Sequence, residues 1–123
     1  MSNLESLVKN WLDDRPTLRA NNTPEAVCDL LIGECKELQV VVAQYLQSEV
    51  CIQEVEQEVA DILIFAITLC VTLGIDFQEA VKTEMAFNYA RYPAVVFQSG
   101  DYEKTRQFCK RRERQKKLRK DFN

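Results

Sequence analysis

Residues 23–47 read TPEAVCDLLIGECKELQVVVAQYLQ, and the spacing of their apolar side chains indicates a long helix. Thr23 is typical of an N-cap, Pro24 would occupy the first helical position, and Glu25 places an acid in the first turn. Glu34 stands on the same helical face as the apolar residues, where Leu or Val is expected. The members of that face lie four and three residues apart: Val27, Leu31, Glu34, Leu38, Val41 and Tyr45.

Helices are expected on both sides of this stretch, because helical spacing continues almost throughout and no sustained alternation of period two appears. Ser2 with Glu5 forms a capping-box pattern at the start of the first helix, and Gly74 is typical of a C-cap. The sequence predicts an all-α protein, an antiparallel helical bundle with a four-helix core. Its other helices are expected near residues 2–12, 53–73, 76–91 and 104–120, and its loops over 13–22 and 48–52.

Composition limits the chemistry that this chain can perform. Its 123 residues contain no histidine, which excludes Ser–His and Cys–His nucleophile systems and His-ligated zinc or haem sites. The five cysteines include no Cys-x-x-Cys pair, so neither a disulfide framework nor a zinc site is expected. No signal-peptide pattern and no membrane-spanning run is visible. We therefore expect a cytoplasmic protein with reduced thiols.

Charge is distributed unevenly along the chain. Residues 101–123 hold ten Lys or Arg and four Asp or Glu, a net charge of +6, whereas residues 1–100 carry −9. We predict one domain over residues 1–100 and a basic helical tail over 101–123. The tail is interpreted first as a solvated or packing helix, because base-stacking aromatic residues do not alternate with its charges. An arm that binds RNA, DNA or phosphate is the second interpretation.

Two pairs of acids carry the strongest chemical signal. Glu34 and Glu37 lie three residues apart, as do Glu58 and Asp61, so each pair projects from one side of a helix. The predicted turn lies midway between the pairs, so an antiparallel hairpin would bring the four carboxylates to the same height. Two carboxylates about 5 Å apart repel by about 3 kcal/mol at an effective dielectric near 20, so the group needs protons or a cation. Ligands made only of oxygen select Mg²⁺, Mn²⁺ or Ca²⁺, and Mg²⁺ implies a phosphate-bearing substrate.

With these motifs the sequence resembles the all-α nucleoside triphosphate pyrophosphohydrolases, the superfamily of MazG and of the dimeric dUTPases. Their hallmark is a Glu-x-x-Glu pair followed, after a variable spacer, by Glu-x-x-Asp, and both parts are present here. Gly33 stands immediately before the first pair, at the position where many members of the superfamily carry an additional Glu. The branch that looks like the dCTP pyrophosphatases also lacks this Glu. That branch also carries the pattern Asn-x-x-Arg-Tyr-Pro at the end of its last core helix, and this chain is similar there, with the same pattern at residues 88–93. The chain departs from the family at Glu84, where a Lys is usual, and Lys82 is the nearest replacement.

The resemblance implies hydrolysis of a nucleoside triphosphate between its α- and β-phosphates, with Mg²⁺ as cofactor and Mn²⁺ as a possible substitute. The metal would polarise the α-phosphoryl group and orient an attacking water. Glu37 is the candidate catalytic base. The implied metal ligands are Glu34, Glu37, Glu58 and Asp61, and the implied phosphate- or sugar-binding residues are Lys82, Asn88 and Arg91.

Other assignments remain open at this stage. Trp11 either stacks on the nucleobase or anchors the first helix in the core. The family and the apolar faces of a helix hairpin imply a homodimer or homotetramer, with nucleotide-pool housekeeping as the expected role. One alternative is an enzyme like phosphoribosyl-ATP pyrophosphatase. Another is a catalytically silent helical dimer that binds RNA or a protein partner through its basic tail, which Glu84 and the missing Glu favour.

Overall fold

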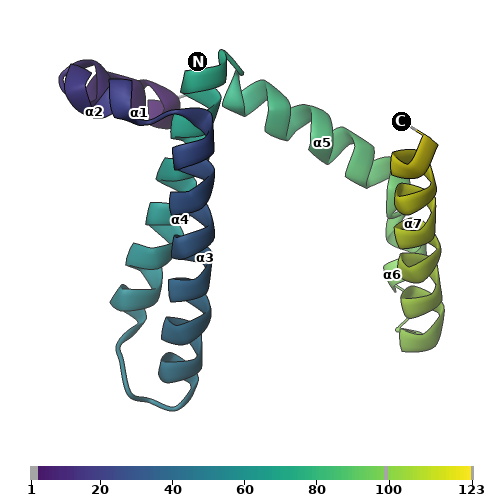
Figure 1. Cartoon of the computed structure of the whole chain (residues 1–123). Coiled ribbons are helices and arrows are strands. Elements are labelled where there is room, and N and C mark those ends of the chain that lie inside the picture. Colours follow the sequence, from purple (N-terminus) through teal and green to yellow (C-terminus); the bar gives the residue numbers. More distant parts are fainter. Residues whose placement is uncertain (1–2, 99, 123) are drawn as a thin grey trace. The chain divides into compact units, whose positions relative to one another are not determined.

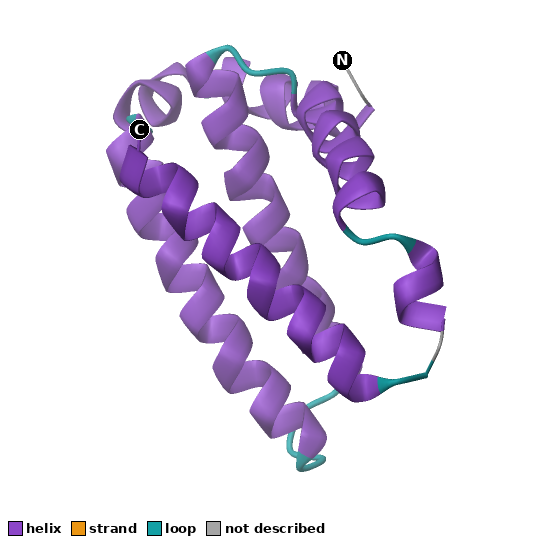
Figure 2. Cartoon of the chain, turned by 90° about the vertical axis from the view of Figure 1, so that its right-hand side faces the viewer, coloured by secondary structure: helices purple, strands orange, loops and turns teal. Residues whose placement is uncertain are grey.

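The computed structural model describes residues 3–98 and 100–122 (Figure 1). Within these residues it consists of helices and loops and contains no strand, as Figure 2 shows. The predicted all-α class is therefore confirmed. The helices are α1 (Asn3–Asp13), α2 (Pro16–Asn21), α3 (Pro24–Leu46), α4 (Ile52–Leu73), α5 (Phe77–Arg91), α6 (Ala94–Gln98) and α7 (Tyr102–Phe122).

The chain divides into two compact units, one ending at Ala80 and the other beginning at Val81. The first unit contains α1 to α4 and the first turn of α5, and the second contains the rest of α5 with α6 and α7. The four-helix core and the separate tail after residue 100 stay predictions.

The central element of the first unit is an antiparallel hairpin of α3 and α4, which lie side by side in Figure 1. Thr23 caps α3 as predicted, because its Oγ1 accepts a hydrogen bond from the Ala26 amide at 3.3 Å. Gly74 ends α4 in the left-handed conformation, with a φ of 71°. The connection between the two helices covers residues 47–51, where the turn was expected. The local signals for the hairpin are therefore confirmed at both ends.

The turn after α3 contains a residue under backbone strain. Ser48 has a φ of 59°, and its amide donates to the Tyr45 carbonyl while the Glu49 amide donates to that of Gln44. A residue with a Cβ pays about 1 kcal/mol in this conformation, so Ser48→Gly is expected to raise the free energy of unfolding by about 0.5–1 kcal/mol. Urea unfolding followed by circular dichroism measures this change. Gly74→Ala is the matched opposite, expected to lower stability by a similar amount, and a Ser48→Gly chain no more stable than the parent would contradict the assignment.

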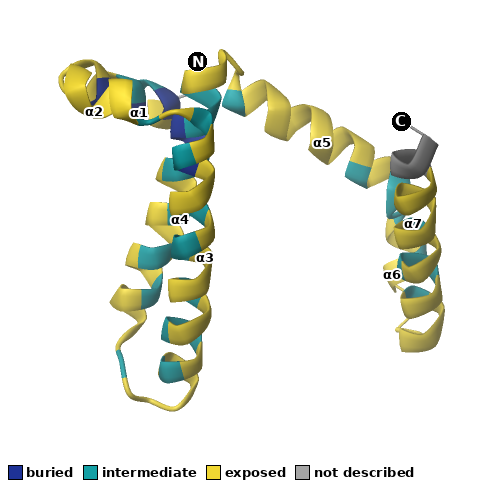
Figure 3. Cartoon of the chain, viewed as in Figure 1, coloured by how far each residue is buried: buried dark blue, intermediate teal, exposed yellow. Residues whose placement is uncertain are grey.

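The core of the first unit lies where α1 packs on α4. Val8 and Leu12 from α1 are buried against Ile67, with Val71 and Phe77 packed around them. Figure 3 shows the buried segments concentrated on α1 and the adjoining ends of the hairpin. Because this core is small, much of the apolar surface of the first unit stays exposed.

Glu5 is a buried carboxylate within this core, only 3% exposed. Its Oε2 accepts a hydrogen bond from the Phe77 amide and its Oε1 from the Gln78 amide, both at 3.0 Å. The expected capping box assigned this side chain to the start of its own helix, and Ser2, the other half of that pattern, lies outside the described residues. Instead, Glu5 binds amides of α5 that have no partner within their own helix. It thereby joins α1 to the start of α5.

One expected irregular stretch is largely helical, and the prediction of a loop over residues 13–22 was wrong. Residues 16–21 form α2 because Pro16 suits the first helical position, and an ion pair between Asp13 and Arg19 links α2 to the end of α1. Residues 94–98, for which no element was predicted, form α6. None of the described helices is by itself long and apolar enough to span a membrane. Among them, α4 and α5 form one bent pair that together has the length and composition of a membrane span.

The second unit is organised around three aromatic rings. Tyr92, Phe97 and Phe108 meet edge to face, with centroids 5.8–5.9 Å apart. Such contacts contribute about 0.5–1.5 kcal/mol each beyond the area that they bury. They anchor α7, which covers the helix expected over residues 104–120, against α6 and the end of α5.

Candidate metal centre

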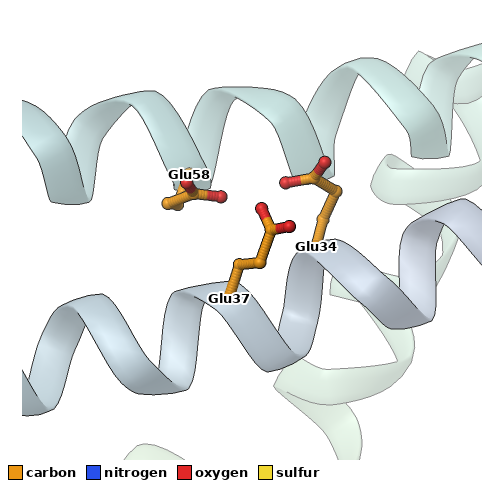
Figure 4. A group of neighbouring side chains, drawn as sticks. All are labelled: Glu34, Glu37 and Glu58. Carbon is orange, nitrogen blue, oxygen red and sulfur yellow. The ribbon is translucent and has the colours of Figure 1, made fainter.

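Three carboxylates from two helices meet inside the hairpin. Glu34 and Glu37 come from α3 and Glu58 comes from α4, and Figure 4 shows them turned toward one another between the helices. One oxygen of each side chain lies within 4.8 Å of the others. The structure therefore brings together three of the four predicted metal ligands.

Asp61, the fourth predicted ligand, lies beside this group rather than within it. It is exposed on α4, one turn after Glu58, and its oxygens fall outside the set that lies within 4.8 Å. Its negative charge nevertheless contributes to the raised pKa of Glu34. Asp61 is therefore close enough to act electrostatically on the cluster.

The three clustered carboxylates lie in an electrostatically unfavourable arrangement, because like charges are close together. Burial, followed by the neighbouring carboxyl groups of Glu58 and Glu37, raises the pKa of Glu34 from 4.5 to about 7. Oε2 of Glu34 and Oε2 of Glu58 are buried and have no hydrogen-bond partner among the described residues. Buried acceptors without partners are costly, and a cation would satisfy both. An oxygen-only donor set with two unpaired oxygens fits Mg²⁺ or Mn²⁺.

The raised pKa of Glu34 predicts how stability depends on pH when divalent cations are removed. Between pH 4.5 and about 7 the folded chain binds more protons at this carboxyl group than the unfolded chain does. The stabilisation from this protonation is fully present below pH 4.5 and is lost as the pH rises through about 7. We therefore expect the melting temperature in EDTA to fall across this range.

Glu34→Gln is expected to flatten this part of the pH profile, because the amide does not titrate. Thermal unfolding in EDTA between pH 4.5 and 8 measures the effect. Glu56→Gln is the matched control, since Glu56 is an exposed acid on α4. If the melting temperature of the Glu34→Gln chain depends on pH in the same way as that of the parent, the raised pKa of Glu34 is contradicted. Added Mg²⁺ should stabilise the parent chain increasingly as the pH rises, since a carboxylate must be deprotonated to bind a metal.

An apolar groove of about 800 Å³ runs along the same unit, with Asp61 in its lining. Trp11 lines this groove and is 46% exposed, so it does not fill the core as one interpretation expected. The Arg15 guanidinium lies 4.6 Å from the centroid of the Trp11 ring and covers it from one side. Phe65 also lines the groove. The groove therefore places aromatic surface in the same cavity as an acid of the predicted metal motif.

The predicted phosphate- and sugar-binding residues lie in the second unit, on α5. Lys82 is exposed, and Asn88 is half-buried. Arg91 is half-buried, its Nη1 donates to Oε1 of Glu84 at 2.8 Å, and its guanidinium lies 5.1 Å from the centroid of the Phe87 ring. Because these residues belong to a different unit from the carboxylates, their joining into one site stays a prediction.

Sequence reasoning assigned Glu5 to a capping box and missed its burial and its hydrogen bonds to α5, although a signal for burial was present. Glu5, Val8 and Leu12 lie three and four residues apart, so Glu5 stands on an apolar helical face, as Glu34 does on its own helix. Both carboxylates are withdrawn from solvent, but Glu5 binds backbone amides whereas Glu34 faces other acids. The partners of each acid, rather than its position on the helix, therefore distinguish an acid that binds backbone amides from one that could bind a cation.

Comparison with family models matches residues 22–96 to the MazG nucleotide pyrophosphohydrolase domain, which is more than half of the chain. No curated protein and no solved structure matches this chain. The matched range contains the three clustered carboxylates and Asp61, whereas Trp11 and α7 lie outside it.

Proposed function

The chain belongs to the MazG nucleotide pyrophosphohydrolase family, and on that premise we propose that it hydrolyses a nucleoside triphosphate to the monophosphate and pyrophosphate with Mg²⁺. The observation that carries this proposal is the meeting of Glu34, Glu37 and Glu58, with two buried oxygens that have no hydrogen-bond partner among the described residues. Mn²⁺ offers the same preference for oxygen ligands and is expected to substitute.

Glu34, Glu37 and Glu58 would hold the metal, and Asp61 would complete the donor set from the next turn of α4. A divalent cation bound there supplies positive charge that polarises the α-phosphoryl group and offsets the charge developing on it. Glu37 is the exposed member of the group, whereas Glu34 and Glu58 are half-buried. Its carboxylate is therefore the one best placed to accept a proton from an attacking water, as a catalytic base.

The groove lined by Trp11 would hold the nucleobase, because a flat ring stacks on aromatic surface and the cavity also includes Asp61 of the metal motif. On α5, Arg91 and Lys82 would pair with phosphate oxygens, and Asn88 would hydrogen-bond the sugar or a phosphate. For Arg91 this requires the substrate to compete with Glu84, which already accepts a hydrogen bond from its guanidinium.

A homodimer or homotetramer is part of the proposal. Large apolar side chains stay exposed on α3, among them Ile32 at 55% and Leu46 at 76%, and a second copy could cover such surface. Removal of particular nucleotides from a cytoplasmic pool is the role that we expect of this activity. The alternative is a catalytically silent helical dimer that binds RNA or a protein partner, which the pairing of Arg91 with Glu84 favours.

A pyrophosphate-release screen of the common ribo- and deoxyribonucleoside triphosphates tests the proposal. With Mg²⁺, we expect turnover of at least one nucleotide, with monophosphate and pyrophosphate as products. Release of inorganic phosphate and diphosphate would indicate cleavage at the wrong bond. No turnover of any nucleotide at micromolar protein would favour the silent dimer, and EDTA provides the matched metal-free control.

A further inference from the structure

Arginines from α5 and α7 meet at a pocket in the second unit. The pocket has a volume of about 370 Å³, and both helices contribute to its lining. Its lining consists of Ala90, Arg91, Phe108, Arg111, Arg112 and Gln115. Three of these six residues carry a guanidinium group, which is the side chain best suited to bind an oxyanion through a planar fork of donors.

Arg112 has hydrogen-bond donors that lack acceptors. The side chain is half-buried, and its Nη1 donates to Oε1 of Gln115 at 2.8 Å. Its Nε and Nη2 are buried and have no hydrogen-bond partner among the described residues. A buried charged donor without an acceptor is costly, so an anion that accepts from Arg112 would remove this cost.

Among the described residues, the positive charge around the pocket is only partly compensated. In the part of the chain that the structure describes, one of the three arginines forms an ion pair, Arg91 with Glu84. Arg111 lines a second pocket with Lys110 and Arg114, so further positive charge adjoins the first. The excess of guanidinium over carboxylate groups favours an anion with more than one negative charge.

The aromatic cluster gives the pocket a fixed wall. Phe108 lines the pocket, and its ring packs against Tyr92 and Phe97 with centroids 5.8–5.9 Å apart. Arg112 lies one turn further along α7 than Phe108 and lines the same pocket as Arg91 at the end of α5. Donors from the two helices therefore line one pocket beside this aromatic wall.

We propose that Arg91, Arg111 and Arg112 form a binding site for a compact phosphate-class oxyanion such as pyrophosphate. The anion site itself follows from the pocket and its donors, whereas the choice of a phosphate-class ligand rests on the proposed function. A nucleic-acid strand is less well matched, because strand binding uses an extended charged groove with aromatic rings free to stack on bases. The ring of Phe108 is instead packed against other aromatic side chains.

Calorimetric titration of the full chain with inorganic pyrophosphate in EDTA tests the site. Without divalent cations the carboxylate cluster cannot bind pyrophosphate through a metal, so the measurement reports only binding that needs no metal, and the variants below assign it to the arginines. Arg112→Gln and Arg111→Gln are each expected to weaken binding by about tenfold or more, because each removes charge-assisted hydrogen bonds. Glu84→Gln is expected to tighten binding several-fold, since it releases Arg91 from its ion pair.

Lys117→Gln is the matched control, because it removes the same charge from α7 at an exposed position that does not line the pocket. Equal weakening by Lys117→Gln and Arg112→Gln would show general charge attraction and overturn the site. If Arg112→Gln reduces the helical signal in circular dichroism, Arg112→Lys keeps the charge without the planar fork and is expected to weaken binding as well. Binding unaffected by any of the arginine variants would also overturn the proposal.

Two further measurements distinguish this anion site from the proposed nucleotide hydrolysis and from a nucleic-acid surface. Glu58→Gln should still bind pyrophosphate in EDTA, even though nucleotide turnover is lost, so failure of one proposal does not imply failure of the other. A single-stranded RNA that binds more tightly than pyrophosphate, with equal sensitivity to Lys117→Gln and Arg112→Gln, would identify a nucleic-acid surface instead and overturn the compact-anion site.

Discussion

Glu58→Gln is expected to lower nucleotide turnover by about a thousandfold or more, which corresponds to about 4 kcal/mol of lost transition-state stabilisation. Glu58 is the carboxylate that α4 contributes to the cluster, and its Oε2 is one of the buried oxygens without a hydrogen-bond partner in the described chain. The amide keeps the size of the side chain but removes the charge that would hold the cation. The loss should appear in kcat at saturating nucleotide and Mg²⁺.

This variant should remain folded, because it removes a negative charge from a cluster of like charges. We expect unchanged helical content by circular dichroism and, in EDTA, a melting temperature at least as high as that of the parent. Glu56→Gln, an exposed change on the same helix, is the control and should keep turnover within about twofold of the parent. Asp61→Asn should act in the same direction as Glu58→Gln. Near-parental turnover in the Glu58 variant would remove the metal assignment.

Glu5→Ala is expected to lower the free energy of unfolding by about 2–4 kcal/mol. The carboxylate is 3% exposed and accepts hydrogen bonds from the Phe77 and Gln78 amides at 3.0 Å each. Its removal leaves two amides at the start of α5 without this acceptor and opens space beside Val8 in a small core. Denaturant unfolding followed by circular dichroism measures the loss.

Two further variants serve as references for the stability of Glu5→Ala. Asp29→Ala removes an exposed acid from α3 and should change stability by no more than about 0.5 kcal/mol. Glu5→Gln keeps one acceptor oxygen and should fall between the parent chain and Glu5→Ala. A Glu5→Ala chain as stable as the Asp29 variant would show that the hydrogen bonds to α5 do not contribute to stability.

Features with local causes could be predicted from the sequence. The start of α3 follows from Thr23 and Pro24, and the end of α4 follows from Gly74, because a cap depends on residues within one turn of it. The meeting of the Glu34 pair with Glu58 was predictable for a related reason. Once two helices of known length are joined by a short turn, the antiparallel register follows from counting residues.

Tertiary contacts decided the features that could not be predicted by counting residues along the chain. Glu5 and Glu34 have the same local pattern, and only the packing of α1 shows that the first binds the start of α5 while the second faces other acids. Likewise, Arg91 and Arg112 line one pocket in the second unit, where the ring of Phe108 from α7 packs against Tyr92 and Phe97. The sequence by itself determined the long helices and the carboxylate hairpin, because caps, spacing and register act over short stretches of chain. Which partner each buried charge meets was decided by the tertiary structure, because those partners come from elements far apart in sequence and are brought together only by packing.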